Sequence, residues 1–193
     1  MPEVTLEAIA RDICLTHGYS FVSQVGAGAF KETFHVRPPG ETSQALKVFR
    51  SGHSDERTTR EISAMQRFDH PNISKLFSVG NHQTDGQEYL YCFEEYLSGG
   101  TLTQRVERRL LSVNDTRTLG EALIQAVAHI ASYDLVHRDL KPDNILFRDE
   151  RVTPVIVDFG LVRDLTKSSI TQTLELPRSR GRVASTPRPL LSL

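Results

Sequence analysis

The apolar residues of this chain change their spacing along its length, and each spacing predicts a different element. Between residues 3 and 17 they recur three to four positions apart, which indicates an amphipathic helix that Gly18 ends. Short β-rich segments separated by Gly and Pro turns then predict strands at residues 21–25, 33–36 and 45–49. The predicted buried face of the first helix consists of Leu6, Ile9, Ala10 and Ile13.

Helical spacing returns at residues 56–68, where Ile62, Met65 and Phe68 share a face and His70-Pro71 closes the segment. The remaining predicted elements are a strand at 89–94, helices at 101–110 and from Asn114 or Asp115 to about 130, and short strands at 144–147 and 155–157. The two later helices are expected to bury Leu102, Val106 and Leu110, and Leu119, Leu123, Ala126, Val127 and Ile130, respectively.

Strands plus one helix, followed mainly by helices, predict an α+β fold in which a small sheet domain is hinged to a helical one. The hinge is expected near residues 95–100, after the strand that Ser98-Gly99-Gly100 breaks. From about Leu174 neither periodicity is present, and prolines and arginines are scattered, so residues 174–193 are predicted to be a disordered tail.

Composition narrows the class of protein. The 193 residues are 38% hydrophobic and 24% charged, with a net charge of −1, which is typical of a globular protein and gives no sign of nucleic-acid binding. Because the sequence has no leader and no membrane-spanning run, we expect a cytoplasmic protein with no membrane segment. Cys14 and Cys92 are too few and too far apart for a disulfide framework, so buried thiols are expected. The histidines show no metal-ligand spacing.

The most informative segment is residues 137–144, which read HRDLKPDN and are followed by Asp158-Phe159-Gly160. Together they closely match H-R-D-L-x-x-x-N and D-F-G, so the chain resembles the eukaryotic-type Ser/Thr protein kinases. The competing interpretation, ordinary charges on surface loops, requires two motifs to coincide at the right distance. The resemblance implies a two-lobed kinase fold with a sheet-rich N-lobe and a mainly helical C-lobe.

The resemblance also implies an activity: transfer of the ATP γ-phosphate to a Ser or Thr hydroxyl of a protein substrate, with ATP and Mg²⁺ as ligands. Asp139 would accept or orient the hydroxyl proton, and Lys141 would offset the γ-phosphate charge. Asn144 and Asp158 would supply oxygen ligands to Mg²⁺, a hard cation. His137 is expected to be structural rather than a base.

On the nucleotide side, a glycine turn between two strands could cover phosphates with its backbone N–H groups, although a tight hairpin explains two glycines equally well. The turn consists of Gly26, Ala27, Gly28, Ala29 and Phe30. Lys31 replaces the family's third glycine, which predicts a stiffer loop with an extra cation near the phosphates. By resemblance, Lys47 would bind the α- and β-phosphates and Glu61 would orient it, whereas charges on a solvated face are the alternative for both.

Residues 89–97 resemble the strand that leads into the kinase hinge, where backbone groups of Glu95 and Leu97 would hold adenine. The simplest register places Glu94 at the back of the nucleotide pocket, and an unpaired carboxylate is costly to bury there. Two alternatives remain open at this point. Either the register is shifted so that Phe93 takes that place, or Glu94 has a cationic partner.

The resemblance covers residues 21 to about 173, and the family's A-P-E motif and following helices are not recognisable after it. We therefore expect a C-terminally truncated domain: an N-terminal helical extension (1–20), an N-lobe (21–96), a partial C-lobe (97–173) and the tail. Because missing helices would leave apolar side chains uncovered, the chain is expected to be marginally stable. An ATP-binding regulatory fragment without turnover and a non-functional remnant are the alternatives to an active kinase.

Overall fold

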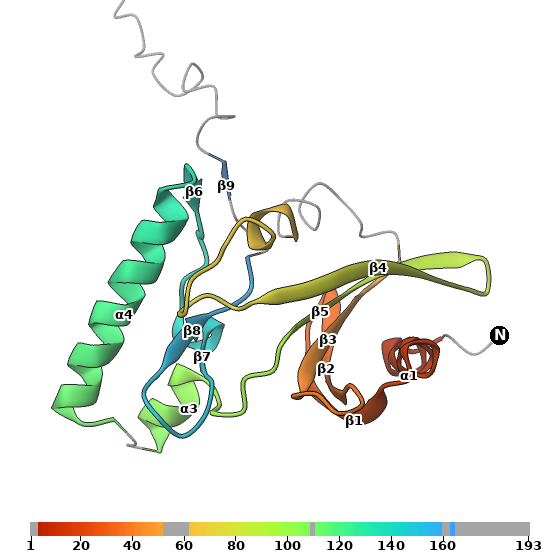
Figure 1. Ribbon diagram of the computed structural model, residues 1–193, viewed down its shortest axis with the longest axis horizontal. Coiled ribbons are helices and arrows are strands. Elements are labelled where there is room, and N and C mark those ends of the chain that lie inside the picture. Colours follow the sequence, from red (N-terminus) through yellow and green to blue (C-terminus); the bar gives the residue numbers. More distant parts are fainter. Residues whose placement is uncertain (1–3, 52–61, 109–110, 160–162, 165–193) are drawn as a thin grey trace, which may run out of the picture.

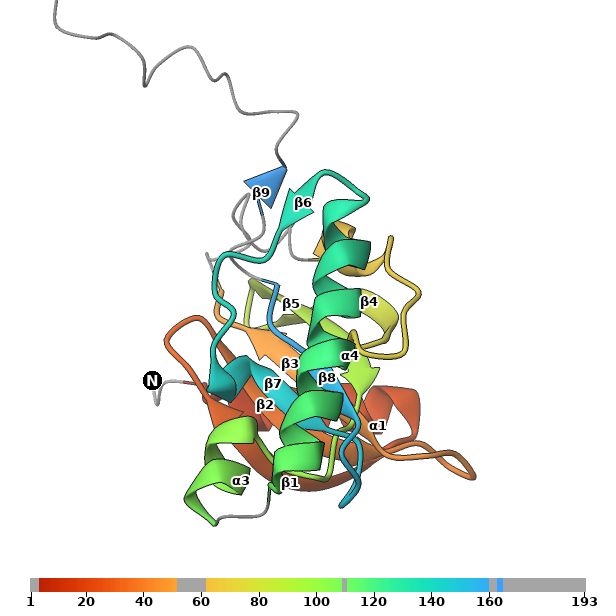
Figure 2. The same cartoon turned by 90° about the vertical axis from the view of Figure 1, so that its left-hand side faces the viewer.

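The computed structural model describes residues 4–51, 62–108, 111–159 and 163–164, and it shows an α+β architecture in two parts (Figures 1 and 2). The first part is a five-stranded antiparallel sheet with the order β1-β2-β3-β5-β4. Its strands are β1 (Ser20–Ala27), β2 (Lys31–Arg37), β3 (Gln44–Phe49), β4 (Leu76–Thr84) and β5 (Gln87–Glu95).

The second part is mainly helical, with small paired strands beside it. Its helices are α3 (Leu102–Glu107), α4 (Val113–Ala131) and the 3-10 turn η1 (Pro142–Asn144). Its strand pairs are β6 (Leu135–Val136) with β9 (Arg163–Asp164), and β7 (Ile145–Phe147) with β8 (Pro154–Ile156). Residues 62–65 are also helical, and the rest of the predicted helix 56–68 up to residue 61 lies outside the described residues.

Strand β3 lies at the centre of the sheet, and all of its residues are buried. Because side chains alternate between the two faces of a strand, the register decides what each face holds. Phe34, Leu46 and Phe93 are cross-strand neighbours on one face, which is part of the hydrophobic core. Lys47 lies on the opposite face, where a cavity separates the sheet from the second part of the molecule.

Helix α1 (Leu6–His17) covers the apolar face of the sheet, beside β1 to β3 (Figure 1). Its start is fixed by the Thr5 side chain, which accepts a hydrogen bond from the Ala8 N–H, and its end by Gly18 at φ 69°. The four predicted face residues are buried, and Cys14 joins them. Burial raises the pKa of the Cys14 thiol to about 11, so this side chain stays protonated near neutral pH.

Helix α4 provides the main packing surface of the second part and crosses in front of β7 and β8 in Figure 2. It begins at a capping box in which Ser112 and Asp115 exchange hydrogen bonds, so the cap is Ser112 rather than the predicted Asn114 or Asp115. Leu119, Ala126 and Ile130 are buried as predicted.

The outer face of α4 differs from the sequence prediction at one position. Val127, predicted to face inward, is exposed. Ile124, three positions earlier, lies beside it on the same face of the helix and is also exposed. Val113, in the first turn, is exposed as well.

Helix α3 corrects a second prediction. The apolar stripe was expected to be buried, yet the Val106 side chain is 58% exposed and Arg105 is the buried residue, at 4% exposure. The Arg105 guanidinium stacks 3.8 Å from the centre of the Phe147 ring and donates hydrogen bonds to backbone carbonyls of Gly99, Asp149, Glu150 and Arg151. Arg105, rather than an apolar side chain, therefore anchors α3, and charge-assisted hydrogen bonds stabilise its burial. Leu110 lies outside the described residues.

Most predicted strands are observed to within a few residues, but β4, β6 and β9 were not predicted. Strand β4 is an edge strand in which every residue is exposed or half-buried, and its sequence lacks the apolar run of the buried strands. Cys14 and Cys92 are both buried thiols, as predicted. Among the described residues, the helices are too short or too polar to cross a bilayer.

Candidate active site

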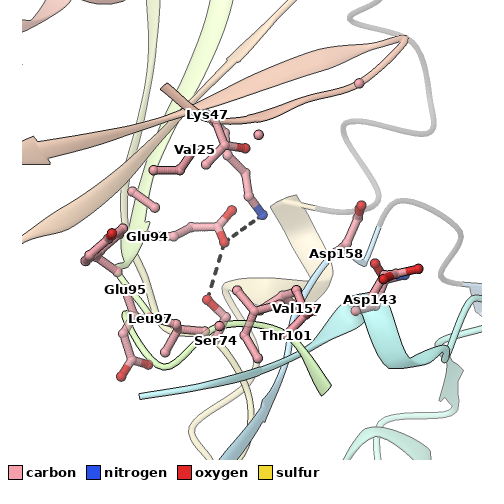
Figure 3. A pocket seen from close by; sticks show the side chains of 18 of the residues that line it. Val25, Lys47, Ser74, Glu94, Glu95, Leu97, Thr101, Asp143, Val157 and Asp158 are labelled. Carbon is pink, nitrogen blue, oxygen red and sulfur yellow. Dashed lines mark hydrogen bonds and ion pairs between the residues drawn. The ribbon is translucent and has the colours of Figure 1, made fainter. Parts of the chain in front are cut away.

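A cavity of about 660 Å³ lies between the sheet and the second part of the molecule (Figure 3). It is lined by many of the predicted site residues: Gly26, Ala27, Gly28, Lys47, Glu95, Leu97, Asn144 and Asp158. Lys31 and Glu94 also line it. The structure therefore brings together residues that are more than a hundred positions apart in the sequence, with Lys47 and Asp158 facing the same space.

The glycine turn forms the roof of this cavity. Gly28 donates its backbone N–H to the Lys31 carbonyl at 3.0 Å, and a Cβ atom on Gly28 would lie only 3.2 Å from that oxygen. Glycine therefore allows the close approach of the two backbone segments. Ala29 and Phe30 do not line the cavity, and Arg50 holds them from outside by hydrogen bonds with their carbonyls.

Lys47 reaches a buried carboxylate at the back of the cavity. Its Nζ lies 2.8 Å from Oε2 of Glu94, and the Glu94 side chain is only 2% exposed. Ser74 Oγ donates to the same oxygen at 3.3 Å (Figure 3). Cys92 Sγ lies 3.4 Å from the other carboxylate oxygen. Glu61, the predicted partner of Lys47, lies outside the described residues.

The sheet register decides between the two alternatives for Glu94. Ala45 pairs with Glu94, and Leu46 pairs with Phe93, so Glu94 shares the cavity face with Lys47. Phe93 points the other way, into the core under α1, where its ring lies 5.0 Å from that of Tyr19. The register is therefore unshifted, and the cationic partner of Glu94 is Lys47.

The hinge crosses at one end of the cavity. The Glu95 carboxylate binds the Arg148 guanidinium, with Nε at 2.5 Å and Nη2 at 3.0 Å. The backbone N–H of Glu95 donates to the Lys75 carbonyl at 2.9 Å, while Leu97 is buried against the cavity wall. This ion pair joins the last residue of β5 to the segment after β7, so it fixes the two parts of the molecule at the hinge.

At the opposite edge, Asp139 is held by two predicted site residues. Lys141 Nζ lies 3.0 Å from Asp139 Oδ2, and Asn144 Nδ2 donates to the same oxygen at 3.0 Å and to the Asp139 carbonyl at 2.8 Å. The hydrogen bond from Lys141 is the main cause that lowers the pKa of Asp139, and the same bond raises the pKa of Lys141. Asn144 lines the cavity whereas Asp139 and Lys141 do not, so this cluster adjoins its rim.

His137 positions the backbone of this loop. Its Nε2 lies 3.1 Å from the Val157 carbonyl, and its Nδ1 accepts the Asp139 N–H at 3.3 Å. A carbonyl can only accept, so Nε2 carries the proton and the ring is neutral. The ring also packs edge-on against Phe159, with the centroids 4.9 Å apart. These contacts agree with the structural role expected for His137.

Asp158 carries its carboxylate on a left-handed backbone, at φ 62°. Such a conformation is costly for a residue other than glycine and is found most often where function requires it. Asp158 Oδ1 lies 2.9 Å from Nζ of Lys31, and the neighbouring Phe159 is fully buried against Phe68. Lys31 was expected only as an extra cation near phosphates, and its contact with Asp158 was not predicted. A lysine in place of glycine was the signal for it.

Comparison with known proteins agrees with this geometry. The family model described as "Protein kinase domain" matches residues 19–178. A CBL-interacting protein kinase 2 of Oryza sativa subsp. japonica is 35% identical over 151 residues, which cover 74% of this chain and 32% of that protein. The probable serine/threonine-protein kinase PknB of Lactococcus lactis is 29% identical over 163 residues, covering 80% of this chain and 25% of that protein.

A third relative, the CBL-interacting serine/threonine-protein kinase 14 of Arabidopsis thaliana, is 34% identical over 149 residues. These residues cover 74% of this chain and 33% of that protein. The chain thus spans a third or less of the length of these three relatives.

Proposed function

The chain belongs to the protein kinase domain family, and we propose that it transfers the γ-phosphate of ATP to a Ser or Thr hydroxyl of a protein substrate. The observation that carries the proposal is the position of Asp139, hydrogen-bonded to Lys141 and Asn144 at the rim of the cavity that Lys47 and Asp158 share. The choice of Ser or Thr rests on Lys141, two residues after Asp139, and on the two relatives named as serine/threonine kinases.

The cavity offers matching surfaces to the parts of a nucleotide. We propose that the Glu95 carbonyl and the Leu97 N–H bind the adenine edge, since both residues line the hinge end. The phosphates would then lie beneath Gly26 and Gly28, toward Asp158. This orientation directs the terminal phosphate to the rim where Asp139 lies.

The donor atoms on the lower wall fit Mg²⁺. Asn144 uses its Nδ2 for Asp139, which leaves its Oδ1 for a cation, and Asp158 already holds a cation, the Lys31 ammonium, at 2.9 Å. Carboxylate and amide oxygens are the ligands that Mg²⁺ takes together with phosphates. When bound, Mg²⁺ neutralises charge that develops on the β- and γ-phosphates.

The protein's own contribution is positioning and charge. The lowered pKa of Asp139 keeps its carboxylate ionised, so it can accept a hydrogen bond from the substrate hydroxyl and orient the oxygen toward phosphorus. His137 fixes the Asp139 backbone, and Lys141 adds a positive charge beside the carboxylate. Phosphoryl transfer needs little covalent chemistry from the protein, so this alignment accounts for most of the catalysis.

The test is transfer of labelled γ-phosphate to a Ser/Thr-containing protein by the wild-type chain and by Asp139→Asn. Loss of a positioned acid–base group lowers a rate by about 10²- to 10⁴-fold, so we expect a decrease of that size. Asp149→Asn is the matched control, because Asp149 is an exposed acidic residue outside the cavity. Equal transfer by wild type and Asp139→Asn contradicts the proposal.

One observation favours a second candidate, a nucleotide-binding regulatory module without turnover. The Lys31 ammonium contacts the Asp158 oxygen that a metal would need. Binding of ATP with Mg²⁺ but no phosphate transfer by the wild-type chain would identify this module. Absence of nucleotide binding would instead fit the non-functional remnant.

The cysteines and the net charge bear on the cellular compartment and on the macromolecular partner. We propose a reducing cytoplasmic setting, which the buried thiols of Cys14 and Cys92 support. A net charge of −1 supports a protein rather than a nucleic acid as the macromolecular partner.

A further inference from the structure

The glycine turn over the cavity is held from outside by an arginine that has no part in the proposed phosphate transfer. Arg50 follows β3 directly, and its backbone N–H donates to the Phe30 carbonyl at 2.9 Å. Its side-chain Nε donates to the Ala29 carbonyl at 3.1 Å. Two consecutive carbonyls of the turn are therefore bound by one residue that does not itself line the cavity.

A carboxylate on the neighbouring strand fixes the Arg50 side chain. Nη2 of Arg50 lies 2.9 Å from Oε1 of Glu32 in β2, and the other oxygen of Glu32 accepts a hydrogen bond from Gln24 Nε2 in β1 at 2.8 Å. The donors of a guanidinium lie in one plane, so engaging both Nε and Nη2 sets the orientation of the whole group. A chain of polar contacts thus crosses the three strands and ends on the turn that joins the first two.

The turn is also held on its inner side. Gly28 donates its backbone N–H to the Lys31 carbonyl at 3.0 Å, and Gly26 and Gly28 both line the cavity. The carbonyl contacts of Arg50 act on the part of the turn that follows these glycines. All of these contacts lie within the protein, so they fix the position of the turn without help from a ligand.

From these contacts we infer that Arg50, oriented by Glu32, is a positioning residue that holds the glycine turn ready over the phosphates of a bound nucleotide. The inference rests on the proposed function, in which the phosphates lie beneath Gly26 and Gly28. Holding a binding element in its bound conformation strengthens binding because less conformational entropy is lost. The Glu32 carboxylate neutralises the Arg50 charge, so the effect is transmitted through the backbone of the turn rather than by attraction of the phosphates.

The experiment measures association and dissociation rate constants of the full chain with ribose-labelled fluorescent derivatives of ATP and adenosine, in the presence of Mg²⁺. Losing one or two hydrogen bonds that position the turn corresponds to about a 3- to 10-fold change. Arg50→Met is therefore expected to accelerate ATP dissociation by that factor. The adenosine derivative has no phosphates under the turn, so its dissociation is expected to stay unchanged.

Two further variants test the role of Glu32 and the specificity of the effect. Glu32→Gln is expected to accelerate ATP dissociation less than Arg50→Met does. The double variant Arg50→Met/Glu32→Gln is expected to match Arg50→Met, because Glu32 acts on the turn through Arg50. Arg37→Met is the matched control, since Arg37 is an exposed arginine at the other end of β2 and does not line the cavity.

The outcomes separate positioning from other roles of Arg50. Unchanged ATP dissociation in Arg50→Met overturns the inference. Slower ATP association with unchanged dissociation also overturns it, because a charge at the rim of a site acts mainly on association. Equal acceleration of ATP and adenosine dissociation would reveal general damage to the sheet and likewise overturns it.

The wild-type chain separates the inference from the proposed function. Wild-type chain that binds ATP but transfers no phosphate overturns the proposed function alone, since the turn would still cover the phosphates. Wild-type chain that binds neither ATP nor adenosine overturns both.

Discussion

A lysine–carboxylate ion pair lies at the back of the cavity and another at its mouth. Their N–O distances are almost equal, 2.8 Å for Lys47–Glu94 and 2.9 Å for Lys31–Asp158. The two ion pairs differ in how much water reaches them. The side chains of the first pair are 9% and 2% exposed, and those of the second are 16% and 40% exposed. Length alone therefore does not reveal what an ion pair contributes, because solvent sets the cost of separating the charges.

The two ion pairs also join different elements of the structure. Lys47–Glu94 links β3 to β5, adjacent strands of one sheet, so it is part of a single packed unit. Lys31–Asp158 links β2 to the segment that follows β8 in the other part of the molecule. Breaking the first disturbs the sheet interior, whereas breaking the second only releases one part of the molecule from the other at the mouth of the cavity.

The largest loss of folding stability is expected from Lys47→Met. The substitution leaves the Glu94 carboxylate buried without its amine, which destabilises a protein by about 3–5 kcal/mol. Urea-induced unfolding followed by circular dichroism measures the loss. The double variant Lys47→Met/Glu94→Met is the control, and we expect it to recover most of the stability. A loss below about 1 kcal/mol in Lys47→Met would show that the back of the cavity is as well solvated as its mouth.

A smaller loss of folding stability is expected from Lys31→Met. Ion pairs that water reaches contribute about 0–1 kcal/mol, and salt weakens them further. We expect a loss of stability within that range at low salt and no difference from wild type at about 1 M salt, where the Debye length is about 3 Å. A loss that persists at high salt would contradict the contrast between the two pairs.

The smallest change is expected at the rim of the cavity, where Lys141→Met alters the pKa of Asp139 and removes only an exposed contact. The Lys141 hydrogen bond is the main cause that lowers the pKa of Asp139, so its removal raises that pKa toward the ordinary carboxyl value. Asp139 then takes up its proton at a higher pH than in wild type. Carbon-13 NMR titration of the Asp139 carboxyl measures the midpoint. Lys75→Met is expected to leave the midpoint unchanged, and an unchanged midpoint in Lys141→Met would contradict the assignment.

The elements that the sequence predicts well are those whose burial is set by local spacing. The residues at positions 6, 9, 10 and 13 can only be buried together if the segment is a helix, and they are buried in α1. The residues of the loop at 137–144 lie close together because they are neighbours in the chain. The resemblance to kinases predicted Asp139, Lys141 and Asn144 as parts of one site, and their contacts need no long-range information.

What could not be predicted depends on contacts between distant segments. Glu94 faces Lys47 because β3 and β5 pair with Ala45 opposite Glu94, and no local pattern specifies that register. The apolar pattern of α3 gave no sign that Arg105 is buried, because its burial depends on carbonyls of the turn at residues 149–151, more than forty positions away. In both cases a charge is buried because another segment supplies its partners, which the spacing of apolar residues cannot show.

Helix α1 has a practical consequence for how the boundaries of this domain are chosen. The family match begins at residue 19, one residue after the helix cap, so a fragment trimmed to the match would lack the helix altogether. Its removal would bare the aromatic and aliphatic side of the sheet, including Phe34, Leu46 and Phe93. Exposed apolar sheet surface of this kind favours aggregation. We therefore propose that the shortest fragment suitable for expression starts ahead of Thr5.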